Sequence, residues 1–212
     1  YPNAPVYTAF VDKKALGKHW QRFANWDIHT TWFAKLPFYK KLYSPMRFLA
    51  ARAFASLNLS KFDVVISSSN AFEAKAVLSK NKKIVSKTKH ICYCHTPPRA
   101  LYGYSTMSAW KKNPIIHFLG NLINHYMRVI DFNVAQKVDF FIANSQETQK
   151  RISKFYRRES QVVYPPVDVK KIASLAGKLK PLFKRNYYFY ISRLGLQKHP
   201  ELAVAACNKL GL

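Results

Sequence analysis

Polar side chains follow the short apolar runs of this 212-residue chain, at the points where each run ends. Their hydroxyls, amides, single imidazole and cations suit a polar, anionic ligand such as a nucleotide sugar. Turns between strands and helices are commonly polar, because their side chains cap helices. His95 and Arg99 are not cap residues, so ligand binding is the favoured interpretation. The polar stretches are 67–70 (SSSN), 95–99 (HTPPR), 144–148 (NSQET) and 192–193 (SR), with Lys198 following.

An alternation of strands and helices would bring these stretches to one edge of a sheet. It predicts βαβ units, and therefore an α/β fold with helices on both faces of a parallel sheet. Ligands of open α/β sheets bind outside the carboxyl ends of the strands. The polar stretches are therefore expected to line one crest of the sheet. Strands are predicted at 62–67, 89–94, 139–143, 161–164 and 186–191, and helices at 71–79, 119–138, 146–156 and 200–208.

Two consecutive prolines, Pro165 and Pro166, interrupt this pattern, and a Lys-rich stretch follows them. Such a stretch is typical of a linker between domains. Gly211 stands where a glycine ends a helix, so a further element is expected after it. We predict a main domain over 1–164, a linker over 165–185 and the beginning of a second domain over 186–212.

A basic and aromatic stretch, 30–59, precedes the first of these strands. One or two helices are expected there, broken near Pro37 and Pro45. Cations beside aromatic rings are typical of a surface that docks on anionic lipid. The alternative is a helix pair packed within the domain, with its lysines exposed.

The composition is globular but strongly basic. Apolar residues make up 49% of the chain, which argues against a disordered or collagen-like protein. No apolar stretch approaches the ~18 residues that span a bilayer. The net charge of +25 predicts an anionic partner: nucleic acid, lipid headgroups or a phosphorylated substrate.

The three cysteines predict a reducing compartment and no disulfide framework. His90, Cys92 and Cys94 would share one face of a strand. Their spacing differs from that of structural zinc sites, so we expect no metal, and the cysteines are interpreted as small core residues.

Five stretches, in this order, resemble family 4 glycosyltransferases: 62–69 (FDVVISSS), 90–99 (HICYCHTPPR), 139–151 (DFFIANSQETQKR), 162–168 (VVYPPVD) and 190–194 (YISRL) with Lys198. The resemblance implies the GT-B architecture, in which two Rossmann-like domains face each other across a cleft. The amino-terminal domain would take the acceptor, and the carboxyl-terminal domain the nucleotide-sugar donor. Transfer would retain the anomeric configuration and use no cofactor or catalytic metal.

The resemblance also assigns roles to single residues. His95 matches the family's active-site histidine, and Arg193 with Lys198 matches the cationic pair that contacts the donor diphosphate. As the glycosidic bond breaks, negative charge grows on the leaving phosphate, and such cations stabilise it in the transition state. The residues expected to line the acceptor side of the cleft are Ser68, Ser69, Asn70, Thr96, Arg99, Asn144, Ser145 and Thr148.

The sequence departs from the family pattern in several places. It begins with Tyr1, without the Gly-rich loop that follows the family's first strand, and it lacks the pair of glutamates of the donor domain. We therefore expect a fragment that is inactive alone. Relatives tend to carry a second basic residue near the position of Asp131, so no role is predicted for this carboxylate.

The leading hypothesis is a hexosyltransferase-like enzyme that transfers sugar from a nucleotide-sugar to a lipid-linked or polysaccharide acceptor. The basic charge favours a cytoplasmic location, peripheral on the inner face of the cell membrane. One alternative is a nucleic-acid-binding protein, which the charge permits. It lacks a recognised motif, so no nucleic acid is expected as a partner. The other is a membrane-associated module without catalytic activity.

Overall fold

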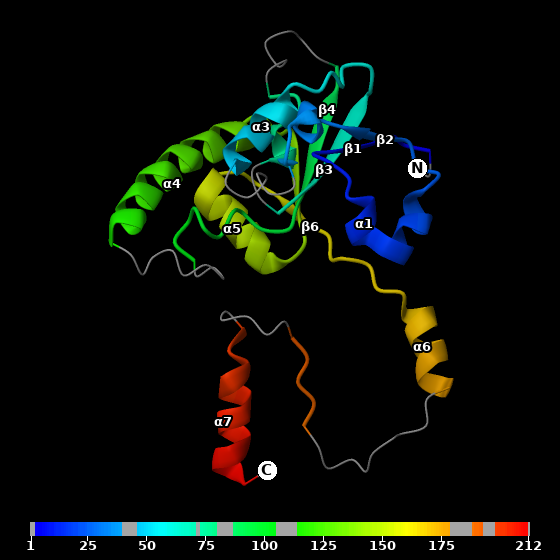
Figure 1. The fold of residues 1–212 in the computed structure, drawn as a ribbon, viewed down its shortest axis with the longest axis vertical. Helices are drawn as coiled ribbons and strands as arrows, with labels where there is room; N and C mark the ends of the chain where they lie inside the picture. Colours follow the sequence, from blue (N-terminus) through cyan, green and yellow to red (C-terminus); the bar gives the residue numbers. More distant parts are fainter. Residues whose placement is uncertain are drawn as a thin grey trace.

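The computed structural model describes residues 3–39, 46–70, 73–79, 87–104, 114–178, 188–192 and 198–211. At its centre is a parallel four-stranded sheet in the order β3-β4-β5-β6, flanked by helices (Figure 1). The predicted α/β fold class is confirmed. The strands are β3 Val64–Ser69, β4 Lys89–Cys94, β5 Phe140–Ala143 and β6 Gln161–Val162.

The four strands of this sheet end level with one another. Ser69 pairs with Cys94, Cys94 with Ala143, and Ala143 with Val162. Each of these residues is the last of its strand. The polar stretch that ends β3 and the polar stretches that follow β4 and β5 therefore lie at one edge of the sheet, as the sequence predicts.

Helices α3 Arg47–Ala55, α4 Pro114–Ala135 and α5 Gln146–Tyr156 lie together on one side of the sheet (Figure 1). Alternation along the strands explains why that face is buried, because every second side chain points toward the helices. Cys92, Cys94 and Phe141 of the sheet pack in one core cluster with Ile152 and Tyr156 of α5. The short helix expected at 71–79 is described from residue 73 onward, and its helical part is the 3₁₀ turn η3 Ala74–Ala76.

The opposite face of the sheet is largely open among the described residues. Val64, Ile66 and Phe140 are 50%, 65% and 59% exposed. They occupy strand positions that alternate with the buried set. This sheet is therefore apolar on both faces, as parallel sheets are. Among the described residues, α3, α4 and α5 cover one of these faces, whereas the sequence predicts helices on both.

A second, two-stranded parallel sheet was not predicted. It pairs β1 Val6–Thr8 with β2 Ile28–Thr30, and α1 Lys13–Leu16 with the 3₁₀ helix η1 Gly17–Phe23 connects them. Strands of three residues are too short for an alternating pattern to be recognised. A cavity of about 390 Å³ separates β1 from β3, lined by residues of both strands.

The basic and aromatic stretch packs into the domain where it is described. It contains the 3₁₀ turn η2 Trp32–Lys35 and helix α3, and residues 40–45 lie outside the described part. Phe33 is fully buried and Phe54 is 8% exposed. The interpretation as an internally packed pair of helical segments therefore fits these residues better than a lipid-docking surface.

The carboxyl-terminal part carries two helices with no buried side chain among those that the structure describes. They are α6 Val169–Lys178, inside the predicted linker, and α7 Pro200–Leu210 (Figure 1). Pro200 occupies the first turn of α7, and Gly211 ends it with φ 69°, as predicted. The strand expected over 186–191 is not formed in its described residues, 188–191. No described helix, α4 included, is long and apolar enough to cross a membrane.

Candidate active site

His95 lies at the shared edge, directly after β4. Its backbone N–H donates to the carbonyl of Ser69 at 2.8 Å, and its Nε2 is 2.9 Å from Oγ of Ser68. The ring of Tyr93 stands edge-on to the imidazole, with centroids 5.2 Å apart. Both His95 and Ser68 are exposed to solvent. The adjoining strand end thus holds an accessible imidazole by its backbone and by its ring nitrogen.

The stretch after β5 supports this histidine from the other side. Ser145 caps α5 by accepting a hydrogen bond from the N–H of Thr148 at 3.2 Å, a position where serine is strongly favoured. The buried hydroxyl of Thr148 donates to the carbonyl of His95 at 3.0 Å. The backbone N–H of Asn144 donates to the carbonyl of Cys94. The hydrogen bonds described for Ser145 and Thr148 thus hold the cap of α5 and the backbone of His95.

Arg151, one turn further along α5, fixes the next residue of the β4 stretch. Its Nη1 donates to Oγ1 of Thr96 at 3.2 Å, and its Nε donates to Glu147 at 3.0 Å. Its guanidinium lies over the ring of Tyr104, 4.6 Å from the centroid. The sequence analysis did not single out Arg151 as a site residue. The i, i+4 spacing from Glu147 was the available signal.

The polar stretch at the end of β3 lines a small cavity of about 180 Å³ at the same edge. Ser69 is buried there, whereas Ser68 and Asn70 are exposed. Glu73, which is 5% exposed, adds a carboxylate that the sequence analysis missed, because a single acidic residue in a largely apolar stretch has no distinctive pattern. Hydroxyl, amide and carboxylate groups can exchange hydrogen bonds with a hydroxylated ligand. Thr8, Ala9, Phe54 and Ala74 complete the lining.

The predicted cations are described only in part. Arg99 is half-buried, and its carbonyl accepts the N–H groups of Tyr102 and Tyr104, which closes a turn after β4. The side chain of Lys198 is exposed, and its carbonyl accepts the hydroxyl of Tyr190 at 2.8 Å. Arg193 lies outside the described residues. The diphosphate-binding role of this pair stays a prediction.

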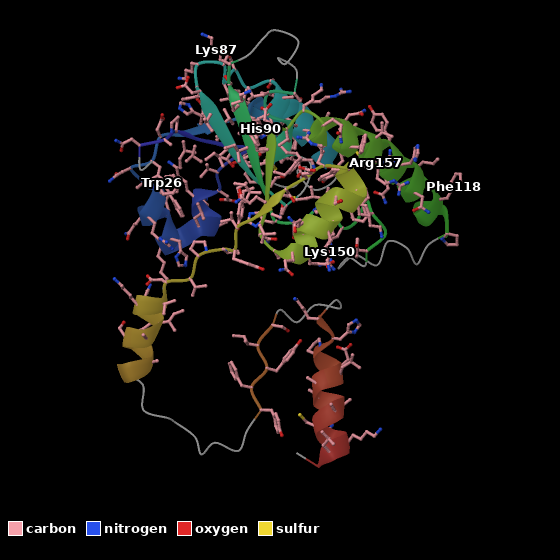
Figure 2. All side chains as sticks on the ribbon, turned by 180° about the vertical axis from the view of Figure 1, so that it is seen from behind. Trp26, Lys87, His90, Phe118, Lys150 and Arg157 are labelled. Carbon is pink, nitrogen blue, oxygen red and sulfur yellow. The ribbon has the colours of Figure 1, made fainter. Side chains whose placement is uncertain are left out.

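His90, Cys92 and Cys94 share the buried face of β4, as their spacing predicts. Oγ of Ser67 lies 2.8 Å from Nε2 of His90, and Figure 2 shows this histidine within the sheet. Burial raises the pKa of both thiols, that of Cys94 to about 12, so they stay protonated at neutral pH. Within the described ranges, no group of three His, Cys, Asp or Glu side chains could hold a metal ion. The two cysteines are core residues.

These features fit one class of protein: a parallel α/β domain with a histidine and a hydroxyl-rich cavity at the carboxyl ends of its strands. The family model for Glycosyltransferase Family 4 matches residues 9–171, more than half of the chain. The chain belongs to this glycosyltransferase family. No curated protein and no solved structure shows a significant match to it.

Proposed function

We propose that the chain forms the acceptor-side domain of a retaining, nucleotide-sugar-dependent glycosyltransferase, and that residues 186–212 begin its donor-binding domain. The acceptor is a lipid-linked or polysaccharide glycan. The membership in family 4 glycosyltransferases supports the reaction class. The observation that carries the proposal is the accessible imidazole of His95, held against Ser68 beside the cavity that Ser69 and Asn70 line.

The chemistry divides between the two sides of the proposed cleft. The bond between the anomeric carbon and the diphosphate breaks, a bond forms to a hydroxyl oxygen of the acceptor, and the proton of that hydroxyl passes to the departing diphosphate. Arg193 and Lys198 stabilise the charge that develops on the departing diphosphate. His95 contacts the transferring sugar, and the serine and asparagine groups of the cavity bind acceptor hydroxyls. No resident metal takes part.

The surface of α4 supports a location at an anionic membrane face. Phe118, Leu122, Tyr126 and Val129 follow one another at helical spacing and are 47–65% exposed. Figure 2 shows Phe118 toward the outer end of α4, away from the sheet. The single acidic residue of this helix, Asp131, is fully buried, so the exposed face carries no negative charge. An apolar stripe on a strongly cationic protein suits anionic lipid.

Thermal melting in the presence of UDP or GDP tests the donor role, with a form of the protein that includes a complete donor half. A rise in melting temperature that disappears in Arg193→Ala/Lys198→Ala is expected. The exposed pair Lys170→Ala/Lys171→Ala on α6 is the matched control and should keep the rise. The absence of stabilisation by any nucleoside diphosphate contradicts the proposal.

His95→Ala tests the active-site role in the same form of the protein. We expect transfer to be abolished while stabilisation by the nucleoside diphosphate is largely kept. His19→Ala changes an exposed histidine on η1 and serves as the control. Turnover retained in His95→Ala refutes the role of this residue.

Co-sedimentation with lipid vesicles tests the membrane location. Vesicles rich in phosphatidylserine should bind the protein, phosphatidylcholine vesicles should not, and Leu122→Glu should weaken binding. Val204→Glu changes a similarly exposed residue on α7 and should leave binding intact. Equal binding by the two variants removes the support that α4 gives.

A further inference from the structure

Four polar side chains meet in the interior beneath the shared edge of the strands. Asp131 of α4 and Lys75 of η3 form an ion pair, and their side chains are 0% and 1% exposed. Nζ of Lys75 also donates to the hydroxyl of Tyr156 at 2.6 Å. The second carboxylate oxygen of Asp131 accepts the hydroxyl of Tyr102 at 2.8 Å. We name these four residues the Asp131 cluster.

The three residues that surround Asp131 in the cluster come from the three segments that form the candidate site. Lys75 follows the Ser68–Asn70 stretch at the end of β3. Tyr102 follows the stretch after β4 that contains His95 and Arg99. Tyr156 ends α5, the helix that begins directly after the β5 stretch. Each polar stretch at the edge thus leads into one side chain that reaches Asp131 directly or through Lys75.

α4 makes a second contact with the segment that follows β4, through a residue one helical turn before Asp131. Nη1 of Arg128 donates to the carbonyl of Leu101 at 3.1 Å, and Tyr102 stacks on Phe155 of α5 at 4.2 Å between centroids. The backbone N–H of Tyr102 donates to the carbonyl of Arg99. Displacement of the Tyr102 hydroxyl would therefore be transmitted to the turn that contains Arg99.

The environment keeps the two tyrosine hydroxyls of the cluster protonated. Burial raises the pKa of Tyr102 and of Tyr156 well above the usual value, and the nearby carboxylate of Asp131 adds to the rise. Hydrogen bonds that donate to a buried carboxylate are directional and strong, because little solvent competes with them. A buried ion pair is often no more stabilising than an apolar pair of similar volume. Directional positioning is what an apolar pair cannot supply.

We propose that Asp131 is a positioning residue that fixes the three polar stretches of the site relative to one another and to α4. Tyr102 links Asp131 to the His95 stretch, Lys75 links it to the Ser68–Asn70 stretch, and Tyr156 links it, through Lys75, to α5. The role of Asp131 in arranging an active site rests on the proposed function. The experiment below does not, because it measures the geometry of the strand ends without any transfer reaction.

Two variants that each remove a single hydroxyl test this assignment by heteronuclear NMR of the folded chain. Tyr102→Phe should displace the imidazole signals of His95 and the amide signals of His95, Thr96 and Arg99, and leave those of 144–148 near their original positions. Tyr156→Phe should displace the amide signals of 144–148 and leave the signals of the His95 stretch near their original positions. Ile152→Val removes one methyl group from the same core and is the matched control, expected to move neither set.

A second pair of variants separates positioning from stability. Asp131→Asn should lower the melting temperature and displace the signals of all three stretches. Lys75→Met/Asp131→Leu should recover melting temperature relative to Asp131→Asn and still show displaced signals. If Asp131→Asn does not fold, the two tyrosine variants decide alone.

Two results would overturn the proposal. In the first, Tyr102→Phe and Tyr156→Phe displace the two sets of signals alike, or no more than Ile152→Val does. In the second, the apolar double variant restores the signals of the three stretches together with the melting temperature, which would make the cluster a replaceable part of the core.

Discussion

Replacement of Lys75 by methionine measures how much the protein is destabilised when the buried carboxylate of Asp131 loses its cation. Lys75 is 1% exposed and Asp131 is fully buried, so the variant leaves a carboxylate in the interior without its cation. Removal of one partner of such a pair costs about 3–5 kcal/mol in the free energy of unfolding. For a chain of this length, each kcal/mol lowers the melting temperature by about 2–4 °C. A fall of roughly 6–20 °C is therefore expected.

Urea unfolding followed by circular dichroism and tryptophan fluorescence measures this loss. The slope of the free energy with urea concentration should stay unchanged, because the surface exposed on unfolding is the same. Lys150→Met changes an exposed lysine of α5, labelled in Figure 2, and should stay within about 0.5 kcal/mol of the original protein. A loss below about 1 kcal/mol for Lys75→Met would mean that the Asp131 carboxylate finds water or another donor, contrary to its burial.

Two further predictions concern the cap of α5 and the buried thiols. Ser145→Ala removes the acceptor for the N–H of Thr148 and should cost about 1 kcal/mol in urea unfolding, whereas Ser145→Asp keeps a capping oxygen and most of the stability. At pH 8, a thiol reagent should label Cys207 and leave Cys92 and Cys94 unlabelled until urea is added, because burial raises the pKa of both, that of Cys94 to about 12. Rapid labelling of Cys94 in the folded protein would show that β4 opens.

Strong local patterns are what made parts of the fold predictable. β4 was predicted with its observed bounds, Lys89–Cys94, because a short β-branched and aromatic run ends there at the polar stretch 95–99. α5 was predicted with its observed bounds, Gln146–Tyr156, because Asn144 or Ser145 could cap its start and Glu147 stands in its first turn. β1 was missed because three residues carry too little pattern. The strand expected over 186–191 rested on aromatic residues alone, and a strand also needs a neighbour to pair with.

Within the candidate site, the sequence predicted only the positions of residues that directly follow a predicted strand. The position of His95 at the edge follows from the strand that precedes it. Its hydrogen bond to Ser68 depends on the register between β3 and β4, which no local pattern fixes. The ion pair between Lys75 and Asp131 joins residues 56 positions apart. Nothing in either segment marks a lysine or an aspartate as buried, so the pair appears only once the helices pack.

The level ending of the strands constrains how this sequence can change. Successive side chains of a strand point to opposite faces, so one residue inserted within Val64–Ser69 would exchange the faces of all residues before it. Ile66 would then turn toward the helices, and Ser67 would leave His90. Insertions at the opposite ends of the strands, such as the connection between η3 and β4, shift no such pairing. Variation in length among homologous chains should therefore concentrate there, while the spacing from Val64 to Asn70 stays fixed.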